Sequence, residues 1–282
     1  MLLRDDKARW AVQFSNLSEL VEWLRNTPRV WRQESSKSYR EHSWTLGASY
    51  DDALRLASQG WEEGVKQLHA LSASVPNSAI YTTEYGTAGE RPDVPRFLSG
   101  DPLHMIHRGR ARVPKPTMTI ALNIRASAAV RAQDIANFGA AICALVDRLE
   151  SRRVRVELLA LFATKNMRLN KRWAVSWTVK RPEDQLDLSA VAFSYAHPAA
   201  MRRLGFAAME RSPAAMEEIG YGRGGGCLPG DFIDLPEGAL LINGVDHNPN
   251  ACRTMEGALA FAKKAINDAA GEPIAELEVL DA

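Results

Sequence analysis

The sequence predicts an α/β fold with a mainly parallel sheet, and three observations support this prediction. From Thr117 onward, short apolar segments alternate with segments whose apolar residues recur at helical spacing. A strand, a long helix and a second strand follow one another over 118–163, and such a βαβ unit makes neighbouring strands parallel. Of the 282 residues, 46% are hydrophobic and 24% are charged, a composition typical of a globular protein and not of a disordered one.

The first 75 residues are expected to form an N-terminal helical segment. Residues 14–26 place Leu17, Leu20, Val21 and Leu24 on one helical face, with Ser15 or Asn16 as the N-cap. A second helix is expected from Tyr50 to about Leu71, because its apolar residues keep a broad common face.

Residues 76–116 are expected to form an extended connection that ends in a basic arm. This segment has weak periodicity and carries five prolines after Pro76. The arm, residues 107–116, ends in prolines that favour extended backbone.

Residues 117–282 are expected to form the α/β domain, a three-layer arrangement with helices around the sheet. The strands are predicted at 118–124, 154–163, 173–180 and 239–245, with a last extended piece at 273–280. The helices are predicted at 131–150, 186–195, 198–211 and 253–269, and a Gly-rich loop at 220–230. The alternation over 173–180 indicates a half-buried strand, which we place at the antiparallel edge of the sheet.

The formal net charge of +1 hides an uneven distribution of charge along the chain. Residues 1–103 carry 12 basic and 14 acidic side chains, residues 104–181 carry 16 and 4, and residues 182–282 carry 7 and 16. A basic middle segment followed by an acidic one indicates either a surface that binds polyanions or ion pairing within the protein. The sequence leaves both alternatives open.

The basic residues fall on the arm and on loops at strand ends. Several cations on one surface are enough for salt-sensitive phosphate binding without a sequence motif. We expect nucleic acid to contact Arg108, Arg110, Arg112, Lys115, Lys165, Arg168, Lys171, Arg172, Trp173 and Arg223. The cluster Arg152, Arg153 and Arg155 starts a strand and is expected at the opposite end of the sheet.

Aromatic residues near these cations favour single strands, because unpaired bases stack on aromatic rings. The candidate stacking residues are Trp173, Tyr81, Tyr85 and either Trp31 or Trp44. No helix-turn-helix, zinc-finger or RNP signature predicts the reading of a duplex. The Gly-rich loop lacks the Gly-Lys-Ser/Thr ending of a P-loop, which favours a surface loop over a nucleotide site.

The sequence predicts no enzyme, no resident cofactor and no metal. His104 and His107 lie in a loop without nearby cysteine or carboxylate ligands, which argues against zinc. No Ser, Cys or Lys nucleophile has a recognisable setting. The chain starts without an apolar export segment and has no apolar run long enough for a membrane span, so we expect a cytoplasmic protein without membrane contact.

The order of elements from 117 to 280 resembles the von Willebrand factor A-like variant of the Rossmann-type fold. The resemblance implies strand-end loops that bind a partner, and in that family an Asp-x-Ser-x-Ser turn after the first strand binds Mg²⁺. Here the turn reads Asn123-Ile-Arg125-Ala-Ser127, in which only Ser127 fits and Arg125 puts a cation at the metal's place. Asp246 alone cannot hold a divalent ion, so a metal-free domain is expected.

A second resemblance lies in the N-terminal half. Trp44-x-x-Gly47, Gly60-Trp61-x-x-Gly64 and the segment 92–102 are similar to uncharacterised proteins encoded by tailed bacteriophages. This resemblance implies a virus-encoded protein of the host cytoplasm, without an assigned chemistry.

We therefore predict a nucleic-acid-binding protein that prefers single-stranded DNA and serves as a phage replication or transcription cofactor. The arm and the strand-end loops would neutralise phosphates while aromatic residues stack on bases. The expected partners are single-stranded nucleic acid and, through the acidic last third, a viral polymerase, another phage protein or further copies of the chain. The alternative is a metal-free von Willebrand A-like module for protein interaction or assembly.

Overall fold

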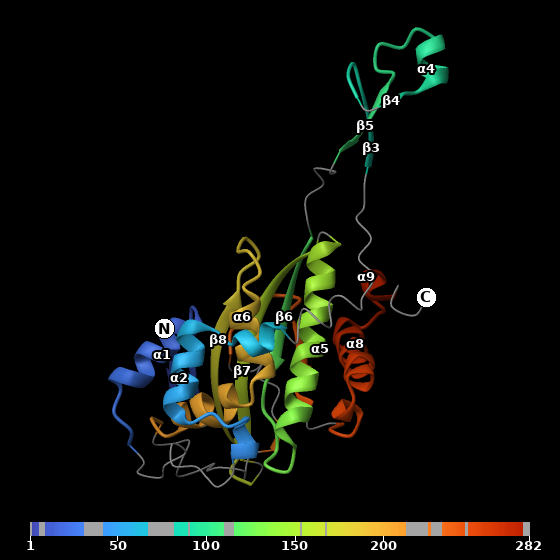
Figure 1. Cartoon of the computed structure of the whole chain (residues 1–282). Coiled ribbons are helices and arrows are strands. Elements are labelled where there is room, and N and C mark those ends of the chain that lie inside the picture. Colours follow the sequence, from blue (N-terminus) through green and yellow to red (C-terminus); the bar gives the residue numbers. More distant parts are fainter. Residues whose placement is uncertain are drawn as a thin grey trace.

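The computed structural model describes residues 2–5, 9–30, 42–66, 82–89, 91–109, 116–152, 154–166, 168–212, 225–226, 233–245 and 248–278. These residues form a main body with one large sheet and a small unit that stands away from it (Figure 1).

The main sheet has the strand order β1–β2–β8–β7–β6–β10, and β9 pairs with β7 beside this path. The strands are β1 (Leu2–Asp5), β2 (Arg9–Phe14), β6 (Thr117–Asn123), β7 (Arg155–Asn166), β8 (Lys171–Lys180), β9 (Gly225–Gly226) and β10 (Leu240–Asn243). Among the five central strands, β2–β8, β7–β6 and β6–β10 are parallel and β7–β8 is antiparallel. The predicted α/β class with a mainly parallel sheet is therefore confirmed.

The position of β8 differs from the prediction. It is antiparallel to β7 as expected, but it is not an edge strand, because β2 pairs with its other side and β1 follows β2. The N-terminal segment is therefore not wholly helical, and the sheet is not confined to residues 117–282. Trp10, Val12 and Phe14 alternate with residues of the opposite face, the period-two pattern that a strand requires.

The main body contains helices and helical turns between and after its strands. They are α1 (Leu17–Asn26), α2 (Tyr50–Gln59), α5 (Ala132–Ser151), α6 (Leu188–Val191), α7 (Phe206–Met209), α8 (Met255–Ala270) and α9 (Ala275–Glu278), with π-helical turns η3 (Ala192–Ala196) and η4 (Ala200–Gly205) and short 3₁₀ turns η2 (His42–Thr45) and η8 (Ala251–Arg253). Within the described part of the chain, none of them is long and apolar enough to cross a membrane.

Most predicted helices are confirmed, and two predictions need correction. The helix expected over 50–71 stops at Gly60, whose φ is +92°, and helical backbone resumes at 62–66. The piece expected to be extended at 273–280 contains α9 instead. Its apolar residues Ile274 and Leu277 are three positions apart, and the Leu277 N–H donates to the Ile274 carbonyl in a helical turn (2.8 Å).

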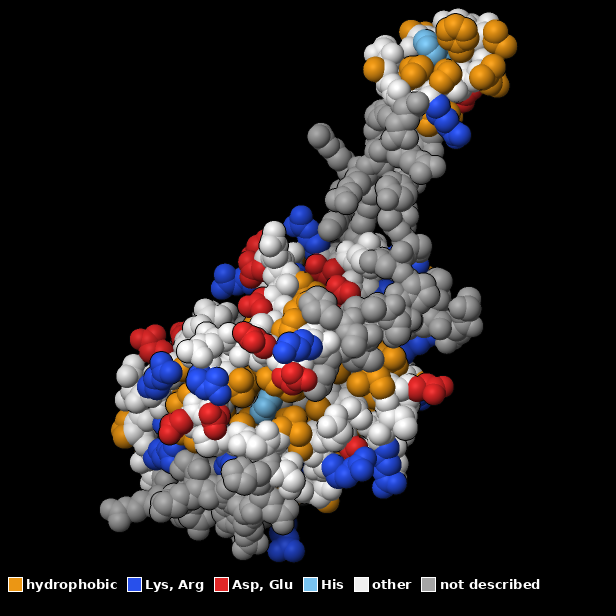
Figure 2. Space-filling model, in the orientation of Figure 1, with side chains coloured by type: hydrophobic (Ala, Val, Ile, Leu, Met, Phe, Trp, Pro, Cys, Tyr) orange, Lys and Arg blue, Asp and Glu red, His pale blue; other side chains and the backbone are white. Residues whose placement is uncertain are grey.

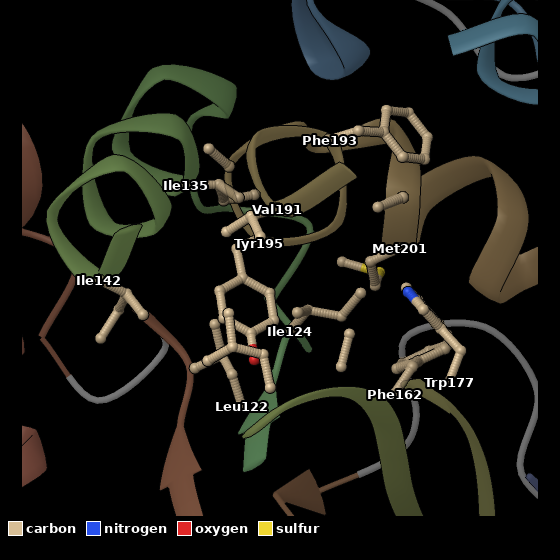
Figure 3. Close-up of a cluster of buried hydrophobic side chains, with 14 of the residues drawn as sticks. Leu122, Ile124, Ile135, Ile142, Phe162, Trp177, Val191, Phe193, Tyr195 and Met201 are labelled. Carbon is tan, nitrogen blue, oxygen red and sulfur yellow. The ribbon is translucent and has the colours of Figure 1, made fainter. Parts of the chain in front are cut away.

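The two faces of the sheet are covered differently. One face meets the helices in the main core, part of which Figure 3 shows around Leu122, Phe162 and Tyr195. The buried residues of the second face form a separate, smaller cluster: Ala11, Ala121, Leu161, Ala163, Ala174 and Ile233. In the described part of the chain, the third layer is thus the segment around Ile233 and Leu235, which packs on these small side chains.

Three buried arginines hold the N-terminal segments against the body. Arg202, Arg203 and Arg211 come from η4 and from the residues after α7. Their guanidinium groups donate to the backbone carbonyls of Trp44, Ser127, Val130, Ala48, Thr27, Leu24 and Ala207. These hydrogen bonds offset part of the cost of burying a charge.

The connection predicted over 76–116 contains the small unit. Its elements are β3 (Thr82–Gly86), β4 (Arg91–Pro92), α4 (Val94–Leu98) and β5 (Met105–Gly109), with the sheet order β3–β5–β4. Figure 1 shows this unit beyond the end of the sheet at which β6 begins.

In the helical layer, α5 and η3 approach each other closely at Gly139. A Cβ at Gly139 would come within 2.1 Å of the Tyr195 carbonyl oxygen and 2.4 Å of the Ala196 Cα. We expect Gly139→Ala to lower the free energy of unfolding by about 2 kcal/mol or more, because backbone must move to admit the methyl group. Urea denaturation measures the change. Lys264→Ala, at an exposed position of α8, is the control and should change stability by less than about 0.5 kcal/mol; equal stability of the two variants would contradict the packing described.

Candidate nucleic-acid interface

The residues between the strands predicted at 154–163 and 173–180 were expected to form a loop, but both strands are longer, and a tight turn joins Asn166 of β7 to Lys171 of β8. The side-chain oxygen Oδ1 of Asn166 accepts hydrogen bonds from the backbone N–H groups of Arg168 (2.9 Å) and Leu169 (3.1 Å). Asn170 adopts the left-handed conformation that the turn requires, with a φ of +53°. Arg168 is exposed at this turn, and Leu169 beside it is 56% exposed.

Three cations from neighbouring strands occupy adjacent register positions next to this turn. Lys165 of β7 lies opposite Arg172 of β8, and Arg172 lies opposite Arg9 of β2. Residues opposite each other in a sheet share a face. We call Arg9, Arg172 and Lys165 the cation row. Lys165 and Arg172 are half-buried, and the next register step on this face holds three alanines, Ala11, Ala174 and Ala163.

The Gly-rich loop approaches the same row. Gly225 and Gly226 form β9, which pairs with Lys165 and Thr164 of β7. The structure therefore places part of this loop beside the cation row, whereas Arg223 lies outside the described residues. Lys171 lies opposite Asn166, one position from the row, so its side chain starts from the other face of the sheet.

Arg9 is the member of the row that sequence reasoning missed. It belongs to β2, which was not predicted, and its place beside Arg172 depends on a strand pairing between residues far apart in the chain. The alternation of Trp10, Val12 and Phe14 was the available signal for the strand, but no local pattern shows its partner.

Trp173 was predicted as a stacking residue for bases, and the structure contradicts this role. Its side chain is 0% exposed. It stacks on Trp10 with ring centroids 5.6 Å apart and an interplanar angle of 6°, and it meets Phe162 edge-on at 5.3 Å. Trp173 follows Arg172 directly, so it points to the opposite face of β8, into the helix-covered core.

The other described aromatic candidates also have protein partners. Arg202 lies over the ring of Trp44 at 4.5 Å, and Arg96 lies over the ring of Tyr85 at 3.8 Å. Trp31 and Tyr81 lie outside the described residues. The hairpin that carries the cations thus shows no described aromatic platform beside them.

The predicted arm and the predicted loop belong to opposite ends of the sheet. Arg108 lies in β5 of the small unit, while Arg110, Arg112 and Lys115 lie outside the described residues. The chain enters β6 at Thr117, whose register partner is Arg155 at the start of β7. Lys165 lies near the other end of β7. Thr117, where the chain enters the sheet, and Lys165 are therefore at opposite ends of the sheet.

The turn after β6, where the resemblance suggested a metal site, is used to join strands. The Asn123 side chain accepts from the N–H of Ala163 (3.2 Å) and of Arg125 (3.3 Å) and donates to the Ala163 carbonyl (3.4 Å). Gly244 packs closely here, since a Cβ would lie 2.6 Å from the Asn123 carbonyl oxygen. Within the described ranges, no three His, Cys, Asp or Glu residues gather as metal ligands would.

A small cavity lies between α5, η3 and η4, and its polar groups are already engaged. It is lined by Ile124, Ile135, Ser194, Tyr195, His197, Pro198 and Met201, and the space open to a water molecule is about 10 Å³. The Tyr195 hydroxyl donates to the Leu159 carbonyl (3.1 Å), and the Ser194 hydroxyl accepts from the Trp177 indole (3.1 Å). This volume suits one water and not a substrate.

We expect Trp173 to support stability and not base binding. Trp173→Ala should lower the free energy of unfolding by about 4 kcal/mol, because it removes a fully buried ring between Trp10 and Phe162. Trp173→Phe keeps most of the packing and should bind a labelled oligonucleotide as tightly as the original chain, as measured by fluorescence anisotropy. If the Trp173→Phe variant is folded but binds the oligonucleotide more weakly, the prediction is wrong and base stacking by Trp173 is supported.

His197 should make the fold sensitive to acid. The side chain is 4% exposed, its Nδ1 accepts from the Ala199 N–H (3.1 Å), and burial lowers its pKa from 6.5 to about 4. Below pH 6.5 the imidazole of His197 is protonated in the unfolded chain but stays neutral in the folded chain. The free energy of unfolding therefore falls as the pH drops from 6.5 to about 4.

The expected loss from this one group is about 3 kcal/mol across that range. Urea denaturation at about pH 7 and about pH 4 measures it. His197→Phe should be less sensitive to acid by that amount. An equal loss in both proteins would show that other groups cause the acid sensitivity.

A family model described as "Domain of unknown function (DUF7192)" matches residues 4–264. No curated protein and no solved structure matches the chain.

Proposed function

The chain belongs to the family of this domain of unknown function, and we propose that it binds nucleic acid, without catalysis, by holding phosphates on the cation row. The observation that carries the proposal is the register of three strands, which puts Arg9, Arg172 and Lys165 at adjacent positions across the sheet. Arg168 at the adjoining turn adds an exposed cation.

The form of this surface suits a phosphate backbone. Neighbouring strands lie about 4.8 Å apart, so a row across three strands spans about 10 Å and can contact more than one phosphate. The next row, Ala11, Ala174 and Ala163, is buried beside Ile233, so phosphate contacts on this face would be confined to the sheet end that carries the cations. Phosphate contacts of this kind release counterions and make binding depend on salt.

The strand preference is a separate part of the proposal. Trp173 is buried, so the preference for single strands no longer rests on stacking at this hairpin. We propose phosphate contacts as the source of affinity, with single-stranded DNA as the ligand predicted from the sequence. A place beside a viral polymerase in replication or transcription stays a prediction.

Fluorescence anisotropy with labelled single- and double-stranded oligonucleotides tests the proposal. The variant to compare is the triple substitution Lys165→Gln, Arg168→Gln and Arg172→Gln. If these side chains hold three phosphates, the slope of log K against log salt for duplex DNA should become shallower by about 2.7 between roughly 50 and 200 mM salt.

The matched control is Arg155→Gln, an exposed cation at the opposite end of β7. Because Arg155 lies outside the cation row, its replacement should change the slope by less than about 0.9, the effect of one phosphate contact. No binding at low salt would remove the proposal and favour a protein-interaction module. Binding that the triple variant leaves intact would show that the row is the wrong site.

A further inference from the structure

We propose that the small unit, residues 82–109, joins two copies of this chain into a two-fold dimer. This inference does not depend on nucleic-acid binding, because the unit and the cation row lie at opposite ends of the sheet. It rests on the packing, the apolar surface and the charges of the unit.

The unit has no buried core of its own. Among the side chains described in 85–89 and 91–106, none is buried. It consists of a five-residue helix on three strands, one of which has only two residues. Units of this size do not gain enough burial to be stable alone and usually need a second surface.

The apolar side chains of the unit gather at its far end. Val94 is 58%, Phe97 58%, Leu98 78% and Leu103 47% exposed, and Tyr85 is 39% exposed. Figure 2 shows several hydrophobic side chains close together on the part of the unit that lies away from the main body. A contiguous apolar surface on a projecting element is typical of an interaction site.

The charges of the unit favour a second copy over a polyanion. Its sequence carries four acids, Glu84, Glu90, Asp93 and Asp101, and three bases, Arg91, Arg96 and Arg108, so its formal net charge is −1. A unit with a slight excess of acids does not attract nucleic acid, whereas a second copy carries charges of both signs that can pair with those of the first.

The unit also offers groups that a two-fold axis can pair. Arg96 forms an ion pair with Asp101 (3.4 Å), but among the described residues no ion pair engages Arg91 or Asp93. Within the described part of the chain, the Asp93 carboxylate accepts only the Arg96 N–H (3.2 Å) as the N-cap of α4, so it can take an Arg91 of a second copy as a further partner, and two-fold symmetry makes this contact twice. Among the strands that the structure describes, β3 pairs only with β5, so its other side can add the copy's β3 in antiparallel fashion.

Sedimentation velocity of the full chain over a range of concentrations tests this dimer. We expect a mass that rises from 31.1 kDa towards twice that value as the concentration increases. Leu98→Asp should raise the dissociation constant of the dimer about 100-fold. A two-fold interface contains the substituted residue twice, and we expect each added carboxylate to weaken dimerisation about tenfold. Phe97→Asp is the second variant, and both positions are exposed enough for the fold to tolerate the change.

The matched control is Val30→Asp, an equally exposed apolar position on the main body (52%), which should dimerise as the original chain does. Circular dichroism confirms that all three variants are folded. A chain that stays monomeric at every concentration would overturn the proposal, and so would a dimer that Leu98→Asp and Phe97→Asp leave unchanged. Co-sedimentation of the original chain with lipid vesicles in place of self-association would identify a membrane as the occupant and also overturn it.

Discussion

The pairing of β7 along both of its edges fixes the position of the other parts of the main body. Residues Arg155 to Leu161 pair with β6 in parallel, and Leu158 to Asn166 pair with β8 in antiparallel fashion. The β6 pairing ends at Leu161, so the last residues of β7 extend beyond the parallel strands. Their free side accepts β9 of the Gly-rich loop, and their other side carries the β8 hairpin. The cations therefore stand at an exposed sheet end because one strand is longer than its parallel neighbour.

The arginines of the helical layer explain how the N-terminal half joins this sheet. Strand β2 pairs with β8 in parallel, a pairing that requires the chain to return from a distant part of the sequence. Arg211 donates to the carbonyls of Leu24 in the last turn of α1 and of Thr27 just after it, and Arg203 donates to Ala48 before α2. Loop carbonyls that would otherwise be buried without partners are satisfied by guanidinium groups. The irregular π-helical turns that carry Arg202 and Arg203 let both side chains face the same N-terminal segments.

The sequence supports prediction where a pattern is local. The βαβ unit from β6 through α5 to β7 and the late helix α8 follow from periodicity, and the structure confirms them. The predictions fail where the outcome depends on distant partners. No pattern within residues 9–14 shows that they pair with β8. The cations of the hairpin were predicted from composition, but their register position beside Arg9 comes from strand pairing. Arg110, Arg112 and Lys115 of the arm lie outside the described residues and stay predictions.

The alternation of side chains along β8 decides what kind of recognition this hairpin can provide. Arg172 and Trp173 are neighbours in the sequence, yet a strand sends them to opposite faces. Trp173 finds its stacking partner in Trp10, its register neighbour on β2, so the aromatic surface is used to hold two strands together. Arg172 finds Arg9 at the preceding step of the same pairing. The parallel pairing of β2 with β8 thus places Trp10 and Trp173 in the core and leaves the basic residues for the opposite face of the sheet. If the proposed function holds, a surface built this way would recognise charge and spacing, and any discrimination between bases would come from other parts of the chain.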